Sequence, residues 1–431
     1  MMRVGLLASL IAACGSNPTG SGSPDASTTE ADAAGDVDAS ITPDGPMACA
    51  ATESCDGVID DNCDGVVDEG CGRCPLLAIS CVTGCCPVDR WEVATASATG
   101  ASIAVDSVGN IFFAYTVPSS GPWTAHLAIY DAVPGTWRSM PLGGGGYRNR
   151  VIVDAMDRVH TLNAGNGSSL QYRRSDDHGV TFSAPVTVGI LNSGDLFDMK
   201  IDTTGAPHVA YNGDRVATSF GDLRYTHLVG TTWTSTTLDE ATTAPDNPTL
   251  ELGFGNRPHI VTNAYTPGGV AGYAKRYTFH NGNRWITENA DSFASGATYT
   301  GFDYFSAQSL RIDGSDAREL LFSRQDSGAA DTLYLARRGA ADLDTWQVTP
   351  ITGVSSFTTP TMFVDAHGKR GAVSDGLTLH REGTGTAWTS TPIGVPGLNV
   401  AVARRGRYLY LGFSGGTQSG PPTVTVVDLG P

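Results

Sequence analysis

A pattern of short apolar stretches around a turn recurs seven times in the part of the sequence that follows residue 90. The first copy reads Ile103-Ala-Val-Asp106 and is followed by a second apolar stretch over 109–115. The turn positions Asp106 and Asp154 are 48 residues apart, and so are Asp154 and Asp202. A repeat of this length indicates a unit that buries its apolar face by stacking on its neighbours. The seven turn positions are Asp106, Asp154, Asp202, Gly253, Asp313, Asp365 and Ala403.

An aromatic residue opens a later stretch of the repeat and gives a second landmark. No aromatic follows Ala403 at the usual spacing, whereas Trp91 stands alone ahead of the first repeat. We therefore expect the strand around Trp91 to complete the last unit, beside the strands at Val400 and 424–427. The six aromatics that follow the first six turns are Trp137, Phe182, Trp233, Trp285, Trp346 and Trp388.

Each repeat predicts four short strands, with an inner pair such as 199–202 and 207–211. A lone sheet of this size cannot bury both faces, and radial stacking of such sheets leaves only short edges. We therefore expect an all-β fold, a seven-bladed β-propeller of four-stranded antiparallel blades over residues 87–431, closed by its N-terminal strand. A row of β-sandwiches is the alternative, but the repeat is about half as long as a sandwich domain.

The charge balance argues against one class of partner. The chain has 27 basic and 44 acidic residues, a formal net charge of -17, and such a surface repels phosphate backbones. We expect no nucleic-acid ligand. The 53 glycines and the 16% of charged residues also favour short strands joined by turns over long helices.

The first fourteen residues indicate export. Arg3 precedes an apolar run from Val4 to Ala13, which is too short to span a membrane. The run ends in Ile11-Ala-Ala-Cys14, which resembles the lipobox of bacterial lipoproteins. This resemblance implies a signal peptide over 1–13, a lipid on Cys14 as the only membrane attachment, and a place at the outer membrane or cell surface of a Gram-negative bacterium. An ordinary signal peptide with a chance cysteine is the alternative.

Residues 14–48 have the composition of a linker. They are mostly Gly, Ser, Thr, Ala, Pro and Asp, with six acidic side chains and no basic one. Because so little apolar surface is available to offset the entropy of ordering, we expect a disordered, acidic tether.

Eight cysteines crowd into residues 49–86, and none follows. An even number of cysteines in an exported chain predicts four disulfides, whose pairing the sequence does not decide. A zinc site built from Cys71, Cys74, Cys81 and Cys85 is the alternative. The eight are Cys49, Cys55, Cys63, Cys71, Cys74, Cys81, Cys85 and Cys86.

An eight-residue repeat inside this module, 55–62 followed by 63–70, clusters carboxylates. Such clustering is costly unless a cation neutralises it, and Ca²⁺ prefers six to eight oxygen ligands. The segment resembles the metal-binding Cys-Asp-Gly repeats of surface lipoproteins from Gram-negative soil bacteria, and more distantly the calcium repeats of thrombospondin type 3. An acidic, disulfide-bonded module without metal is the alternative. The expected Ca²⁺ ligands are Asp60, Asn62, Asp64, the Val66 carbonyl, and Asp68 or Glu69.

One repeat contains Ser175-Asp-Asp-His-Gly-Val-Thr-Phe182. This stretch resembles the Asp-box of sialidases and related propellers. The resemblance implies a turn-forming role, in which Ser175 and Asp177 bind backbone amides, Gly179 takes a positive φ, Thr181 completes the motif and Phe182 packs between strands. No sequence pattern selects the arginine triad that an active sialidase needs, so the motif predicts the blade and not catalysis.

Three histidines, His160, His208 and His259, each lie six residues beyond the turn position in successive repeats. They could form a metal-binding ring in the central channel. We favour a structural role, because ligands of one metal must converge and repeated units disperse them.

Two insertions carry the candidate ligand-binding residues. Trp123 follows the Pro118–Pro122 insertion, while Tyr299, Asp303 and Tyr304 belong to a longer insertion before Asp313. Exposed aromatics beside a carboxylate are typical of sugar or peptide contacts, although the rings could also pack under their own loops. We expect a monomeric surface protein that binds an extracellular glycan or protein without catalysis. The alternative is a sialidase-like exo-glycosidase acting at the propeller mouth.

Overall fold

The computed structural model describes most of the chain beyond residue 78. All described residues belong to the second of two compact units, 50–431. They are 79–81, 84–86, 88–94, 97–119, 123–133, 135–146, 148–165, 168–192, 196–213, 221–239, 246–265, 273–293, 308–324, 332–341, 344–352, 354, 361–365, 368–374, 378–383, 387–392, 398–406, 408–414 and 421–429.

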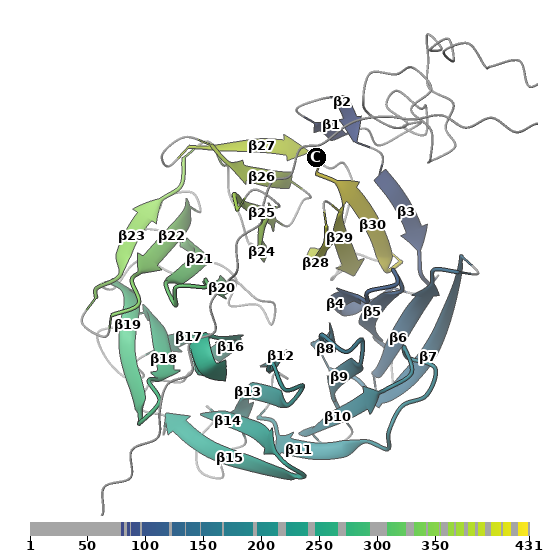
Figure 1. The fold of residues 1–431 in the computed structure, drawn as a ribbon, viewed down its shortest axis with the longest axis horizontal. Coiled ribbons are helices and arrows are strands. Elements are labelled where there is room, and N and C mark those ends of the chain that lie inside the picture. The colour runs from purple at the N-terminus through teal and green to yellow at the C-terminus, as the bar shows by residue number, and fades with distance from the viewer. Residues whose placement is uncertain are drawn as a thin grey trace, which may run out of the picture. The chain divides into compact units, whose positions relative to one another are not determined.

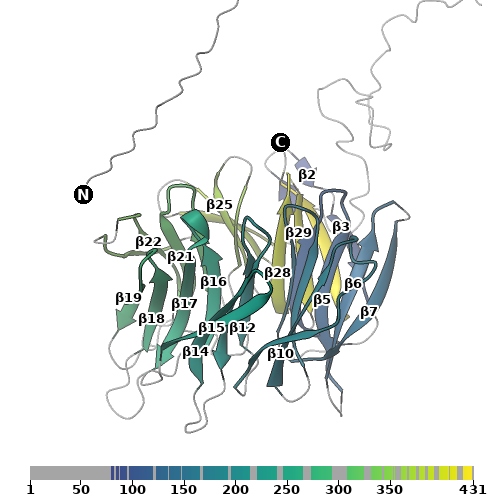
Figure 2. The same ribbon diagram turned by 60° about the horizontal axis from the view of Figure 1, so that its bottom comes forward.

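Seven four-stranded antiparallel sheets form a ring (Figure 1), and the strands of each sheet run between the two faces of that ring (Figure 2). This confirms the predicted all-β propeller. Each sheet is one blade, numbered here in chain order, and in blades 1–6 the strands lie in sequence order from the centre outward. Blade 1 is β4(Thr99–Val105), β5(Ile111–Val117), β6(Thr124–Asp131) and β7(Thr136–Gly144); blade 2 is β8(Asn149–Val153), β9(Val159–Ala164), β10(Ser169–Ser175) and β11(Val186–Ile190); blade 3 is β12(Phe197–Ile201), β13(Pro207–Gly213), β14(Asp222–Val229) and β15(Thr232–Asp239).

The remaining blades follow the same plan. A short 3-10 helix, Phe254–Asn256, lies in the first turn of blade 4. Blade 4 is β16(Asp246–Leu252), β17(Pro258–Tyr265), β18(Tyr273–His280) and β19(Trp285–Phe293); blade 5 is β20(Gln308–Ile312), β21(Arg318–Arg324), β22(Thr332–Arg338) and β23(Gln347–Pro350); blade 6 is β24(Thr361–Val364), β25(Arg370–Ser374), β26(Thr378–Glu382) and β27(Trp388–Pro392).

Blade 7 is closed by a strand from the start of the propeller, as the solitary Trp91 predicts. Its strands are β28(Leu398–Arg405), β29(Tyr408–Ser414), β30(Thr423–Asp428) and β3(Val88–Glu92). In the antiparallel pairing of β3 with β30, Trp91 lies opposite Val424. A separate hairpin, β1(Ile79–Cys81) and β2(Gly84–Cys86), precedes β3.

The inner turns follow one backbone design in all seven blades. The third residue after each turn position has a positive φ, between +58° and +97°, which explains the frequent Gly, Asn and Asp there. The Asp at the turn position binds backbone amides, as Asp202 does with Thr204 N and Ala206 N, both at 2.8 Å. The seven left-handed residues are Gly109, Asp157, Gly205, Asn256, Asp316, Gly368 and Gly406.

These turns also join neighbouring blades. Where the left-handed residue has a polar side chain, that side chain accepts the backbone N–H that follows the turn position of the preceding blade. Ser107 N donates to Asp157 Oδ1 at 2.8 Å, and Phe254 N donates to Asp316 Oδ1 at 3.2 Å. The sequence repeat therefore fixes contacts between blades as well as within them.

The apolar core is divided among the blade interfaces. Seven clusters of buried side chains each draw on two neighbouring blades, including blades 7 and 1. The landmark aromatic of the fourth strand packs on the blade before it, as Trp233 does edge-on against Tyr172 at 5.3 Å between ring centroids. Burial of such rings stabilises the stacking that the repeat length predicts.

Several sequence predictions lie outside the described residues. These are the signal peptide, the lipid on Cys14, the tether, the Ca²⁺ ligands between Asp60 and Glu69, and the cysteines up to Cys74. Only the backbone of the strands that contain Cys81, Cys85 and Cys86 is described, so the disulfides stay predictions. None of the helices among the described residues has the length and hydropathy to cross a membrane.

Candidate ligand site at blades 5 and 6

The residue at the sixth position after each turn position differs in type between the blades. In blades 2, 3 and 4 this position holds His160, His208 and His259, which are buried. Each imidazole Nδ1 makes a hydrogen bond with a tyrosine hydroxyl on the third strand; for His160 the partner is Tyr172, at 2.7 Å. The opposite nitrogen, Nε2, faces an Asp of an inner turn, such as Asp154 at 3.1 Å from His160. The geometry agrees with a structural role for the three histidines.

Burial lowers the pKa of each of these histidines, and it lowers that of His259 to about 4. They are therefore neutral at physiological pH. The described residues contain no group of three or more His, Cys, Asp and Glu side chains suited to a metal ion.

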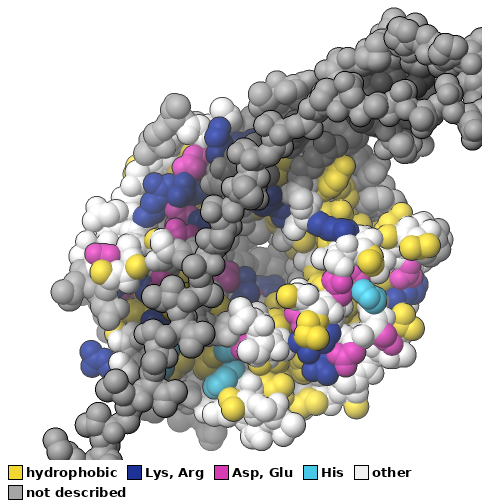
Figure 3. All heavy atoms as spheres, viewed as in Figure 1, with side chains coloured by type: hydrophobic (Ala, Val, Ile, Leu, Met, Phe, Trp, Pro, Cys, Tyr) yellow, Lys and Arg dark blue, Asp and Glu magenta, His cyan; other side chains and the backbone are white. Residues whose placement is uncertain are grey.

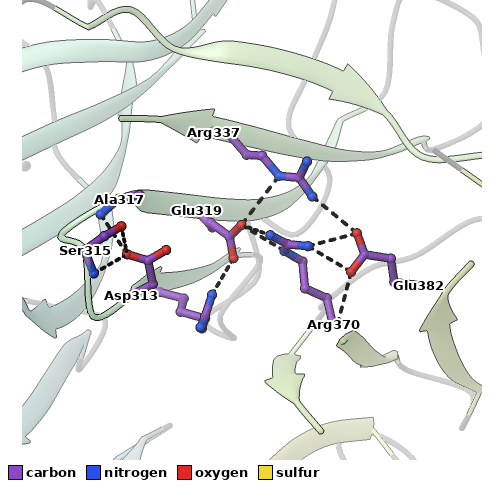
Figure 4. Close-up of polar contacts among 8 residues, drawn as sticks. Asp313, Ser315, Ala317, Glu319, Arg337, Arg370 and Glu382 are labelled. Carbon is purple, nitrogen blue, oxygen red and sulfur yellow. Dashed lines mark hydrogen bonds and ion pairs between the residues drawn. The ribbon is translucent and has the colours of Figure 1, made fainter. Parts of the chain in front are cut away.

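In blade 5 the same position holds a carboxylate, Glu319, at the start of β21. Its side chain is only 6% exposed. Arg311 Nη1, from the neighbouring strand β20, donates to Glu319 Oε2 at 2.8 Å, and Arg370 Nε, from blade 6, donates to Oε1 at 2.8 Å. Figure 4 shows Arg370 pointing toward Glu319 from the neighbouring blade. A buried carboxylate requires such partners, because an unpaired charge in the interior is strongly destabilising.

A second carboxylate, Glu382 on β26, lies on the other side of Arg370. Arg370 Nη1 donates to both Glu382 oxygens, at 2.9 and 2.8 Å. Arg337, on β22, then bridges the two carboxylates from the solvent side, with Nε 3.5 Å from Glu319 Oε1 and Nη2 3.3 Å from Glu382 Oε1 (Figure 4). The result is an alternating network of two carboxylates and three guanidinium groups across the junction of blades 5 and 6.

This network sets the protonation state of its members. Burial alone would raise the pKa of Glu319, but the hydrogen bonds and charges of Arg370 and Arg311 outweigh it, so the pKa of Glu319 is lowered. The hydrogen bond with Glu319 raises the pKa of Arg370. Both groups are therefore charged at neutral pH, and Glu319 has no proton to donate.

A cavity of about 380 Å³ adjoins the network at the end of blade 5. A smaller one of about 80 Å³ lies between blades 5 and 6, and Arg337 lines both. On the face shown in Figure 3, basic and acidic side chains lie side by side around the ring. The large cavity is lined by Ala317, Arg318, Glu319, Arg337, Arg338, Gly339, Asp344, Thr345 and Gln347.

The cavity presents hydrogen-bonding groups of both kinds. Arg337 is 48% exposed and supplies donors, whereas Glu319 and Asp344 supply acceptors. Gln347 and Thr345 add an amide and a hydroxyl, and they are joined to each other by a 3.3 Å hydrogen bond. The site is thus suited to bind a polar molecule.

Of the residues predicted to bind a ligand, Trp123 is the one that the structure describes, and it does not line this cavity. Trp123 is partly buried in the connection between β5 and β6 of blade 1, and its carbonyl accepts Gly145 N at 2.8 Å. That connection and the blade 5 cavity lie at opposite ends of their antiparallel blades. Tyr299, Asp303 and Tyr304 lie outside the described residues, so their role stays a prediction.

The segment that resembles an Asp-box forms a tightly bonded turn in blade 2. Ser175 Oγ accepts Gly179 N at 2.8 Å, and Asp177 Oδ1 accepts Thr181 N at 2.8 Å. Hydrogen bonds from Thr181 and Ser175 lower the pKa of Asp177 to about 2, with the bond from the Thr181 hydroxyl making the largest contribution. Gly179 has φ +80°, and Phe182 packs on the cluster shared by blades 1 and 2. The contacts hold the loop in place and leave Asp177 ionised.

Sequence reasoning missed Glu319, Arg337 and Arg370. The repeat did contain a signal, because Glu319 replaces the histidine that occupies the sixth position in the three preceding blades. A charged residue at a position buried elsewhere in the repeat requires a compensating partner. The partners themselves could not be chosen from 24 arginines without the arrangement of the blades.

Comparison with family models and with curated proteins finds no match for the chain. Solved structures share its fold. A structure described as the polysaccharide lyase Uly1 superposes with a TM-score of 0.54 at 10% identity, covering 77% of this chain and 90% of that one. An α-L-arabinanase of Penicillium chrysogenum in complex with arabinobiose gives a TM-score of 0.50 at 12% identity, covering 79% and 99%. At such identities the likeness establishes the propeller fold alone.

Proposed function

We propose that this protein binds an extracellular glycan through its propeller and does not catalyse its cleavage. The observation that carries the proposal is the cavity beside Glu319, where paired charges and neutral polar groups face a space of about 380 Å³. Small-ligand sites commonly have this size and a few convergent polar groups. The two similar structures described above are glycan-active by their titles, which supports a glycan as the ligand class.

The protonation of the carboxylates argues against hydrolysis at this site. A glycosidase needs a carboxylic acid with a raised pKa and a second carboxylate across the scissile bond. Among the described residues, each Asp or Glu whose pKa is shifted has it lowered. Glu319 and Glu382 bracket the guanidinium of Arg370, which fills the space that a sugar would need.

A glycan-processing enzyme is the second candidate, because the two similar structures carry enzyme names. Its catalytic groups would have to lie elsewhere, as in the predicted loop with Tyr299, Asp303 and Tyr304. The buried His–Tyr pairs of blades 2–4 are unsuited to it, since burial raises the pKa of Tyr172 to about 12 and the imidazoles are enclosed.

A glycan array tests the proposal and separates the two candidates. The purified chain should bind one glycan class saturably and return it unchanged, as judged by chromatography of the incubated glycan. Release of shorter products would favour the enzyme. Failure to bind any glycan would contradict both.

We propose further that Cys14 anchors the protein by a lipid and that residues 15–48 hold the propeller away from the membrane. The lipobox-like Ile11-Ala-Ala-Cys14 supports this. Changing Cys14 to Ser should move the protein from the membrane fraction to the soluble fraction. Retention of Cys14→Ser in the membrane fraction would refute the lipid anchor.

We also propose that residues 49–86 form a disulfide-bonded module that binds Ca²⁺ through Asp60, Asn62, Asp64, Val66 and Asp68 or Glu69. The clustered carboxylates support it, because they repel one another without a cation. Equilibrium dialysis of the full chain against ⁴⁵Ca²⁺ should show a bound ion that Asp64→Asn weakens. Equal retention by both proteins would contradict this ligand set.

A further inference from the structure

The positive and negative charges around the blade 5 cavity balance one another. This balance affects which class of glycan the cavity can bind. This inference rests on the proposed function. Five guanidinium groups and five carboxylates lie in or next to the cavity. The guanidinium groups belong to Arg311, Arg318, Arg337, Arg338 and Arg370, and the carboxylates to Glu288, Asp316, Glu319, Asp344 and Glu382.

Each lining arginine already faces a carboxylate. Arg318 Nη2 lies 3.2 Å from Asp316 Oδ2, and its other two nitrogens donate to Gly339 O and to the Tyr277 hydroxyl. Arg338 Nε lies 2.9 Å from Glu288 Oε1. Arg337 is shared between the two carboxylates of the network. The cavity thus contains three cationic side chains but no uncompensated positive charge among them.

An anionic ligand would have to compete with these fixed carboxylates for the arginines. Breaking a partly buried ion pair leaves a carboxylate without its partner, which is costly. The net charge of -17 adds a long-range repulsion of anions. Glycans that carry uronate or sulfate groups therefore gain little binding free energy from their charge in this cavity.

A neutral sugar meets none of these costs. Its hydroxyl groups donate and accept, so they fit a surface on which guanidinium donors and carboxylate acceptors alternate. Arg337 is the exposed one of the three lining arginines, and its Nη1 makes no hydrogen bond or ion pair with the described part of the chain. Gln347 and Thr345 extend the rim with uncharged groups.

We infer that the cavity at blade 5 selects a neutral glycan, made of pentose or hexose units without uronate or sulfate, and that Arg337 is a specificity-determining contact.

The test compares neutral and acidic polysaccharides with the full purified chain at low and high salt. Arabinan, galactan and mannan represent the neutral class, and polygalacturonate and a sulfated galactan represent the acidic class. We expect saturable binding to a neutral polymer, with an affinity that changes less than about twofold between 0.05 and 0.5 M NaCl because no net charge is paired. We also expect Arg337→Gln to weaken that binding about tenfold or more, while Arg284→Gln, at an exposed turn of blade 4, leaves it unchanged.

The outcomes separate this inference from the proposed function. Binding that is confined to acidic polymers, or that is as tight for them as for neutral ones, overturns the inference and leaves glycan binding intact. If Arg337→Gln melts like the parent and still binds the neutral polymer as tightly, the binding site does not lie at this cavity. No binding to any polymer overturns the proposed function itself.

Discussion

Blades 2–4 and blade 5 use the sixth position of the repeat in opposite ways. In blades 2–4 the sixth position carries a buried neutral histidine whose hydrogen bond to a tyrosine lies within its own blade, as between His208 and the Tyr225 hydroxyl at 2.5 Å. In blade 5 it carries an ionised carboxylate whose main partner, Arg370, comes from the next blade. The comparison teaches that one backbone position can either complete a blade or join two blades, depending on whether its side chain is neutral or charged.

The largest effect should follow from removing the carboxylate. Glu319→Ala leaves Arg370 and Arg311 without their shared partner, so we expect a loss of about 3–5 kcal/mol in the free energy of unfolding. Urea denaturation measures it. The matched control is Glu251→Ala, whose ion pair with Lys200 is more exposed and should contribute less than about 1 kcal/mol. If Glu319→Ala and Glu251→Ala lower the free energy of unfolding equally, Glu319 stabilises the fold no more than an exposed ion pair does.

The two regions should also lose stability in different pH ranges. The pKa of His259 is about 4 in the folded protein and 6.5 in its ordinary state, so the unfolded chain binds more protons between these values. Stability from the neutral histidine is therefore complete above pH 6.5 and is lost as the pH falls toward 4, by about 3 kcal/mol. His259→Phe, which copies Phe112 of blade 1, should flatten this part of the profile of unfolding free energy against pH.

Glu319 should affect the free energy of unfolding at a lower pH than the histidines do. Its pKa is lowered from 4.5, so its contribution is complete above that value and is lost only as the pH falls further. A pH profile of the parent chain that is flat between 6.5 and 4.5 would contradict the assignment of neutral buried histidines to blades 2–4.

A smaller effect is expected from the tyrosine partner of a histidine. Tyr225→Phe removes the hydroxyl that meets His208 Nδ1 and leaves that buried nitrogen unsatisfied, which typically costs about 1–2 kcal/mol. Thermal or urea unfolding detects the change. If Tyr225→Phe is as stable as the parent, the hydroxyl contributes nothing to blade 3.

The smallest change in stability should come from Arg337. Because its side chain is half exposed, we expect Arg337→Gln to alter the free energy of unfolding by less than about 1 kcal/mol. A larger loss of stability would mean that Arg337 serves the junction of blades 5 and 6 and not a ligand.

The sequence was sufficient to predict the ring and its closure. The turn positions and aromatics mark local units, and the isolated Trp91 predicted the pairing of β3 with β30 that the structure contains. These features depend on a pattern that repeats, so each copy supports the interpretation of the others. The turn at Ser175 is local as well, since Ser175 and Asp177 bind residues within the same short loop.

The candidate site was not predictable in the same way. Glu319 and Arg370 are 51 residues apart and belong to different blades, so neither residue type nor local spacing identifies the pair. Nor does burial follow from residue type alone, because Arg338 is enclosed while Arg337, its neighbour in sequence, is half exposed. The difference arises because side chains alternate along β22, so that Arg338 packs against Glu288 and Phe279 of blade 4 while Arg337 points toward Glu382 of blade 6.

Because β3 pairs with β30, both ends of the propeller lie in the same blade. The ring should therefore stay complete if the two chain ends were joined and new ends were opened at another turn. If Val88 were joined through a short linker to the residues after β30, and new ends were opened at the exposed turn around Gly282, all seven sheets would keep their strands. Such a circular permutant should fold to the same ring, because exposed turn tips tolerate new termini. A chain that lacks β3 would instead expose β30 as the edge strand of blade 7.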